Sequence, residues 1–131
     1  MILLDTSGLF CYYHREETLH ADAVILFESA IGKIIHSYVL AEFIPLCQVR
    51  GIHRVRILSF VDTILSNPAI EFIWADKYLY QDALNLLKNH PDKTYSLCDA
   101  ISFVLMHKRG ITDALTTDHH FEQAGFFRLL Q

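Results

Sequence analysis

Short apolar runs alternate along the chain with longer stretches whose apolar residues have helical spacing. Residues 1–4 are apolar and stop at Asp5, which predicts a buried strand. Apolar positions three and four residues apart predict helices over residues 20–31, 38–50 and 53–66. Further strands are expected at residues 33–36, 70–74, 114–116 and 126–130.

Polar residues mark the start of several of these elements. Asp76 is expected to cap a helix that runs to about residue 90, and Ser96 a helix over residues 97–109. Thr6 or Ser7 is expected to cap a helix after the first strand.

Two further signals concern helix length. Pro45 lies inside the helix predicted for residues 38–50 and should shorten or kink it. A helical turn is expected at residues 121–124, with Asp118 as one candidate for its cap.

The alternation of strands and helices predicts one α/β domain over residues 1–131. We expect a three-layer sandwich with a mostly parallel central sheet flanked by helices. Functional sites in such sheets lie at the carboxyl ends of strands, where Asp5 and residues 116–118 are found. The aromatic residues expected in the core are Phe43, Phe60, Phe72 and Trp74.

The composition indicates a globular protein. Hydrophobic residues make up 52% of the chain and charged residues 20%, which argues against disorder. No apolar run approaches the roughly 20 residues that span a bilayer, and no signal peptide is evident, so a cytoplasmic location is expected. A mean hydropathy of +0.24 suggests that a partner or a second copy covers some apolar surface. Cys11, Cys47 and Cys98 are odd in number and widely spaced, which favours free thiols.

Four acidic residues stand in unusually apolar surroundings: Asp5, Glu42, Asp99 and Asp118. Buried carboxylates are costly unless they are paired or bound to a metal, and no Lys or Arg lies within several residues of the first three. A hard divalent cation, Mg²⁺ or Mn²⁺, suits a site that offers only oxygen ligands. Each acid taken alone also fits a structural role, as a turn former, a helix-edge residue or a cap. The pattern of all four together favours a metal site.

The four acids stand in segments that resemble the PIN-domain family, and within it the VapC-type toxins of toxin–antitoxin pairs. The similarity covers nearly the whole chain and is carried by residues 4–7, 41–43, 95–103 and 115–121. The third and fourth segments are the more specific. Cys98 before the third acid and His119–His120 after the fourth are small departures from the family pattern.

This resemblance implies a metal-dependent ribonuclease that cleaves RNA. By this resemblance, the residues that match the family's catalytic and metal-binding acids are Asp5, Glu42, Asp99 and Asp118. The fourth acid, here Asp118, often acts through water or on a second metal in this family. Polar support is implied for Thr6, Ser7, Thr116 and Thr117. The implied partners are RNA, a cognate antitoxin and a second copy in a homodimer. Residues 10–13 are a candidate for the contact with the antitoxin or the second copy.

Other functions remain open on the sequence alone. A catalytically silent binding module of the same fold and a DNA-directed nuclease are the main alternatives. A phosphatase with Asp5 as nucleophile is disfavoured, because Ser7 stands where such enzymes usually have a second acid. The net charge of −4 does not favour nucleic-acid binding, although bound cations reverse the local charge of a metal nuclease.

Two groups of basic residues have both a functional and a structural interpretation. Arg50, His53, Arg54 and Arg56 either contact phosphates or form a solvated helix face, and we favour the solvated face. For His119 and His120 we favour a loop or cap role over metal binding, because adjacent side chains do not easily share one ion.

Overall fold

The computed structural model describes residues 1–131 as five strands and seven helices. In chain order they are β1 (Ile2–Leu4), α1 (Thr6–Tyr13), α2 (His20–Ser29), β2 (Lys33–His36), α3 (Ser37–Val49), α4 (Arg54–Ser66), β3 (Ile70–Ile73), α5 (Lys77–Asn89), α6 (Leu97–Arg109), β4 (Asp113–Leu115), α7 (His119–Gln123) and β5 (Phe127–Arg128).

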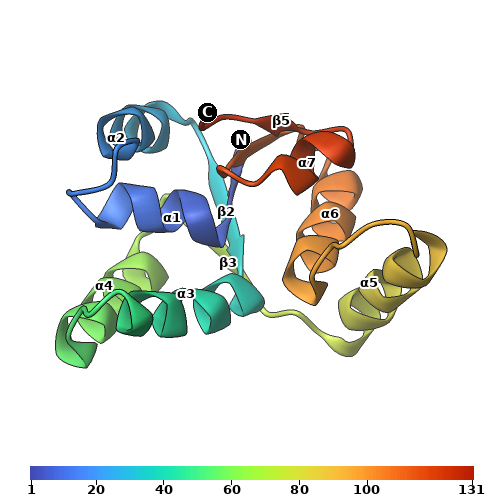
Figure 1. The fold of residues 1–131 in the computed structure, drawn as a ribbon, viewed down its shortest axis with the longest axis horizontal. Coiled ribbons are helices and arrows are strands. Elements are labelled where there is room, and N and C mark those ends of the chain that lie inside the picture. Colours follow the sequence, from blue (N-terminus) through green and yellow to red (C-terminus); the bar gives the residue numbers. More distant parts are fainter.

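The strands form one sheet in the order β3-β2-β1-β4-β5, and every neighbouring pair is parallel. Figure 1 shows α1–α4 on one side of the sheet and α5–α7 on the other. The predicted three-layer α/β sandwich is confirmed. The order of the strands reverses between β1 and β4, because β2 and β3 extend the sheet on one side of β1 and β4 and β5 on the other. Such a reversal opens a crevice at the carboxyl ends of the two strands.

Successive strand residues bury their side chains in opposite halves of the core. Leu4 and Ile35 pack with residues of α1–α4, whereas Leu3 and Ile34 pack with residues of α5–α7. All four side chains are fully buried. The central strands are therefore apolar on both faces, which explains why the sequence shows them as continuous apolar runs.

Helix α1 packs unusually close to β4. A Cβ atom on Gly8 would lie 1.8 Å from the carbonyl oxygen of Leu115, so only glycine allows this contact. The close approach brings the start of α1 beside the end of β4.

Two local predictions are wrong, and a third is wrong in its expectation of a shorter helix. Thr6 and Ser7 do not cap α1, since Asp5 occupies the N-cap position and the hydroxyl groups of Thr6 and Ser7 bind other side chains. Pro45 does not shorten α3, which continues through it to Val49. The carbonyl that proline leaves without a helical N–H partner belongs to Ala41, an exposed residue. Trp74 is 75% exposed rather than in the core, since it follows the edge strand β3.

Several other predictions hold. Asp76 caps α5 through Leu79, Ser96 caps α6, and Gly110 ends α6 in the left-handed conformation. The three cysteines are free and buried. None of the helices is both long enough and apolar enough to cross a membrane.

Candidate active site

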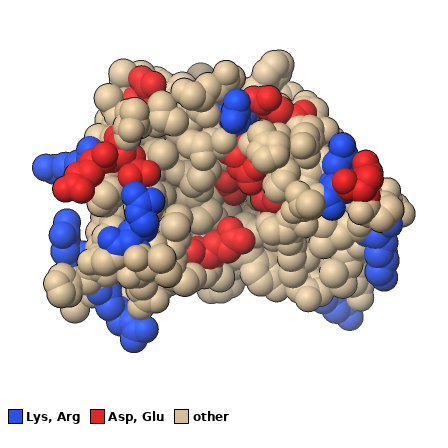
Figure 2. Space-filling model, viewed as in Figure 1, with Lys and Arg blue, Asp and Glu red and all other residues tan.

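The four predicted acids line one cleft of about 300 Å³ beside the carboxyl ends of β1 and β4. Figure 2 shows acidic side chains gathered in a hollow at the centre of this face, while most Lys and Arg side chains lie toward its margins. No Lys or Arg lines the cleft, whose lining residues are Asp5, Thr6, Ser7, Glu42, Leu46, Thr94, Ser96, Asp99, Asp118 and His120.

Asp5 is the most deeply buried of these acids, with 4% of its surface exposed. It directly follows β1, so the strand fixes its position at the floor of the cleft. Thr116 donates a 2.7 Å hydrogen bond to its Oδ2, and Ser7 donates a longer one of 3.3 Å. Burial raises the pKa of Asp5 to about 7, and the negative charge of Asp99 adds to this effect against the opposing hydrogen bond from Thr116.

A network of hydroxyl groups joins the end of β1 to the end of β4. The Oγ atom of Ser7 lies 3.1 Å from the Oγ1 atom of Thr116 and accepts a 3.0 Å hydrogen bond from the backbone N–H of Thr117. Thr116 Oγ1 also accepts a 3.0 Å hydrogen bond from the backbone N–H of Asp118. The polar residues between the two strand ends therefore hold Asp5 and the segment leading to Asp118 in a fixed relation.

Glu42 enters the cleft from α3. Its Oε1 accepts a 2.9 Å hydrogen bond from the hydroxyl group of Thr6 in the first turn of α1. Glu42 is exposed, so it is the most solvated of the four acids. The hydrogen bond from Thr6 holds the Glu42 carboxylate at the lining of the cleft.

Asp99 lies in the first turn of α6, where it completes a capping box. Its Oδ2 accepts from the backbone N–H of Ser96, and its own N–H donates to the Ser96 hydroxyl, both at 3.0 Å. Burial raises the pKa of Asp99, and nearby Asp118 raises it further. The same residue thus begins a helix and carries a charge in the cleft.

Asp118 is the N-cap of α7, as one of the sequence interpretations had it. Its Oδ1 accepts a 2.9 Å hydrogen bond from the backbone N–H of His120. Its side chain is 30% exposed at the open side of the cleft.

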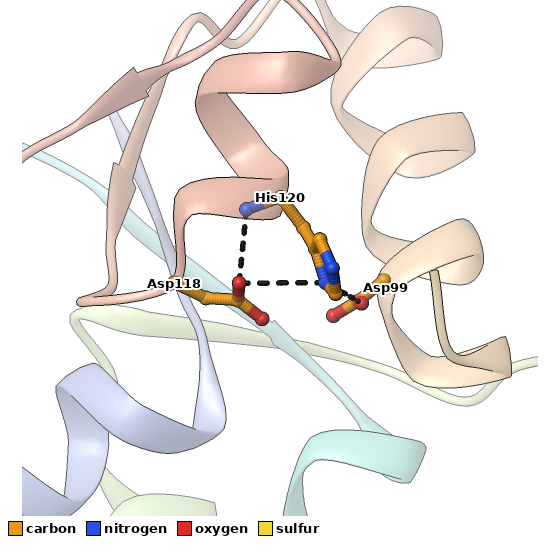
Figure 3. A group of neighbouring side chains, drawn as sticks. All are labelled: Asp99, Asp118 and His120. Atoms are coloured by element: carbon orange, nitrogen blue, oxygen red, sulfur yellow. Dashed lines mark hydrogen bonds and ion pairs between the residues drawn. The ribbon is translucent and has the colours of Figure 1, made fainter. Parts of the chain in front are cut away.

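His120 is a site residue that the sequence reasoning missed. Figure 3 shows its ring beside the carboxylates of Asp99 and Asp118, and its Nδ1 atom lies 3.1 Å from Asp99 Oδ2 and 3.4 Å from Asp118 Oδ1. His119, by contrast, has a side chain that is 65% exposed. One signal was available: His120 is the second residue after the capping Asp118, a position whose backbone N–H binds the capping side chain.

The chemistry of the cleft fits a divalent cation. Four carboxylates surround it without a lysine or arginine, and burial together with mutual repulsion raises the pKa of Asp5 and of Asp99. A bound cation offsets both the burial of these negative charges and their mutual repulsion. Carboxylate oxygens are the ligands that Mg²⁺ and Mn²⁺ prefer. Asp99, Asp118 and His120 also place one potential ligand atom each within 4.8 Å of one another.

Comparison with known proteins agrees with this geometry. Residues 2–127 match the model of the PIN domain. The chain belongs to the PIN-domain family. The expected resemblance is therefore confirmed, and it extends over almost the whole chain.

Two relatives of this PIN-domain chain carry the name 23S rRNA-specific endonuclease VapC20, from two strains of Mycobacterium tuberculosis. Each is 32% identical over 127 residues, which cover 96% of this chain and 95% of the relative. The crystal structure of VapC20, described as a sarcin–ricin loop cleaving toxin, superposes with a TM-score of 0.91. That match has 27% identity and covers both chains completely.

Proposed function

We propose that this PIN-domain chain is a metal-dependent endoribonuclease and the toxin of a toxin–antitoxin pair. The observation that carries the proposal is the cleft in which Asp5, Glu42, Asp99 and Asp118 meet without a basic side chain. The similarity to VapC20 toxins over almost the whole chain supports RNA as the substrate. As such a toxin, the chain would act on cytoplasmic RNA, and residues 1–131 would form one nuclease domain.

Within this proposal, Asp5, Glu42 and Asp99 would hold Mg²⁺ or Mn²⁺. Thr6 orients Glu42, and Thr116 and Ser7 orient Asp5, through the hydrogen bonds described above. Asp118, more exposed than Asp5 and Asp99, would position a second ion or the attacking water. The Thr117 backbone N–H keeps the Ser7 hydroxyl in place.

A divalent ion would supply charge neutralisation at the phosphate and a water of lowered pKa. The chain supplies orientation, because each carboxylate has at least one hydrogen-bond partner. It also supplies a strongly negative cleft that favours cations over bare RNA phosphates, so substrate binding should depend on the metal.

The RNA target is part of the same proposal. VapC20 is described as a 23S rRNA-specific endonuclease and as a toxin that cleaves the sarcin–ricin loop. We propose a structured RNA of that kind as the substrate here.

Replacing Asp5 with Asn should abolish RNA cleavage. The substitution keeps the shape and the hydrogen bond from Thr116 but removes a charge that the metal requires. Cleavage of a radiolabelled RNA measures the effect. We expect cleavage to fall at least about 100-fold for Asp5→Asn in Mg²⁺, and equally for the original chain in EDTA. Asp62→Asn on the exposed surface of α4 is the control and should cleave like the original chain. Undiminished cleavage by Asp5→Asn, or by the original chain in EDTA, would rule out this mechanism.

The same assay separates the alternatives. A silent binding module would bind RNA without cutting it, even with added Mn²⁺. A DNA-directed nuclease would cut a DNA oligonucleotide of matching sequence faster than the RNA.

A cognate antitoxin and a homodimer are also proposed. A groove of about 740 Å³ lies between α1, α2 and α4, with Tyr12, Tyr13, Val24, Ile52 and Phe60 among its lining residues. Tyr12 and Tyr13 belong to residues 10–13, the segment that the sequence analysis names as a candidate contact surface. Co-purification with the product of an adjacent gene tests the antitoxin, and light scattering of the isolated chain tests the dimer. Tyr12→Arg should weaken co-purification of the antitoxin without changing RNA cleavage.

A further inference from the structure

Both ring nitrogens of His120 already have partners within the chain. The Nδ1 atom lies 3.1 Å from Asp99 Oδ2, and the Nε2 atom lies 3.0 Å from the Oγ1 atom of Thr94. Asp99 Oδ2 also accepts the backbone N–H of Ser96 at 3.0 Å, so it acts as an acceptor at this position. A carboxylate oxygen only accepts, and therefore Nδ1 of His120 carries a hydrogen and donates it to Asp99.

The ring of His120 is also held from the side. Tyr95 packs against it edge to face, with ring centroids 5.4 Å apart and an angle of 80° between the planes. The His120 side chain is only 15% exposed, and its backbone N–H is bound to Asp118. Rotation of the ring to present a lone pair to the cleft would break the hydrogen bonds to Asp99 and Thr94 together.

The consequence falls on Asp99. Its Oδ2 receives hydrogen bonds from Ser96 and His120, while its Oδ1 receives none from the chain. The carboxylate is thus held through one oxygen, Oδ2, while Oδ1 has no hydrogen-bond partner in the chain. Figure 3 shows this carboxylate beside the ring of His120. Ligand carboxylates in metal sites are commonly oriented by such outer hydrogen bonds.

We propose that His120 is a positioning residue for Asp99 and does not itself coordinate the metal. Thr94 holds the imidazole from its other side, so the segment before α6 becomes part of the site. The inference rests on the proposed metal-dependent function. It differs from the alternative in which Asp99, Asp118 and His120 are all metal ligands.

Binding of Mn²⁺ to the full chain tests this role without an activity assay. Isothermal titration calorimetry should show about tenfold weaker binding for His120→Ala. His120→Asn should recover most of the affinity, because its amide N–H₂ takes the place of Nδ1 and donates to Asp99. Thr94→Val should weaken Mn²⁺ binding less than His120→Ala does, since the ring keeps its bond to Asp99 and loses only the contact of its Nε2 with Thr94. His53→Ala, which removes an exposed imidazole just before α4, is the control and should bind like the original chain.

Pulsed electron paramagnetic resonance of the Mn²⁺-loaded chain gives a second readout. We expect no coupling from a directly bound imidazole nitrogen, and no change in the spectrum when histidine is labelled with ¹⁵N. A strong nitrogen coupling that disappears in His120→Ala would show direct ligation and overturn the proposal. Unchanged Mn²⁺ affinity in a folded His120→Ala would overturn it as well, while leaving the proposed function intact. A chain that binds no Mn²⁺ and cleaves no RNA would instead overturn the proposed function together with this inference.

Discussion

At the scale of single residues, the site depends on side chains that serve both the fold and the cleft. Asp99 begins α6 through its capping box and also presents a carboxylate to the cleft. Thr116, fully buried, accepts from the backbone of Asp118 and donates to Asp5. Charges held in this way cost stability, because burial and repulsion raise the pKa of Asp5 and of Asp99.

Replacing Asp99 with Asn should therefore separate the two roles. The amide oxygen still accepts from Ser96 and His120, so the cap survives, while one charge leaves the cleft. Without divalent cations, we expect the free energy of unfolding to be equal to that of the original chain or higher by up to about 1 kcal/mol. Urea denaturation in EDTA measures it. A loss above about 1 kcal/mol would mean that the charge itself holds the helix start.

Because of the buried His36, we expect the stability of the fold to fall at acid pH, independently of the cleft. It is fully buried at the end of β2, with its Nε2 2.8 Å from the Ser102 hydroxyl, and burial lowers its pKa from 6.5 to about 4. The unfolded chain then binds more protons than the folded chain between these two pH values. Stability contributed by neutral His36 is present above pH 6.5 and is lost as the pH falls toward 4.

The loss should be on the order of 3 kcal/mol across this window. Urea denaturation at a series of pH values measures it, and His36→Gln should show a flatter dependence because glutamine does not titrate. His53→Gln, on an exposed histidine, is the control and should keep the original slope. Equal slopes for His36→Gln and the original chain would contradict the assignment.

At the scale of elements, the contact of α1 with β4 decides whether the site forms. Helix α1 carries Ser7, and β4 leads into Thr116 and Thr117, so the hydrogen bonds of Ser7 to these two residues require the helix to lie close to the strand. Gly8 provides that approach.

Replacing Gly8 with Ala should thus destabilise the protein, although alanine is normally the better helix former by about 1 kcal/mol. The added methyl would overlap the Leu115 carbonyl, and we expect a loss of about 3 kcal/mol or more, with weaker metal binding as α1 moves. Gly51→Ala has open space around its Cβ and a positive φ, so strain alone should cost about 1 kcal/mol. Thermal denaturation compares the two variants. A more stable Gly8→Ala would contradict the close contact.

At the scale of the whole molecule, the acids of four separate elements meet at the point where the strand order reverses. Asp5 follows β1, Asp118 lies beyond β4, and Glu42 and Asp99 come from α3 and α6. The repulsion among them opposes folding, and a cation that binds only the folded cleft should reverse this effect.

Mg²⁺ or Mn²⁺ at about 100 times its dissociation constant should stabilise the folded chain by about 2.7 kcal/mol and raise Tm by several degrees. Differential scanning calorimetry, with NaCl at matched ionic strength as the reference, measures the rise. The double substitution of Asp5 and Asp99 by Asn should abolish it. An equal rise in the double variant would point to cation binding elsewhere on the surface.

Local sequence patterns were enough to predict the helices and strands and to single out four candidate acids. Apolar periodicity depends on neighbouring residues, so it predicted the strands and most helices, and polar residues at the helix starts predicted the caps at Asp76 and Ser96. The apolar surroundings of the four acids, with the family resemblance, singled them out before their geometry was known.

How those residues meet depends on the packing of the elements in three dimensions. Thr6 binds Glu42 across 36 positions, and His120 binds Asp99 across 21, because helix packing brings together residues that no local pattern links. The exposure of Trp74 likewise depends on β3 being an edge strand. Local sequence fixes which side chains leave a strand or begin a helix, whereas the partner of each polar group is set by which elements pack together.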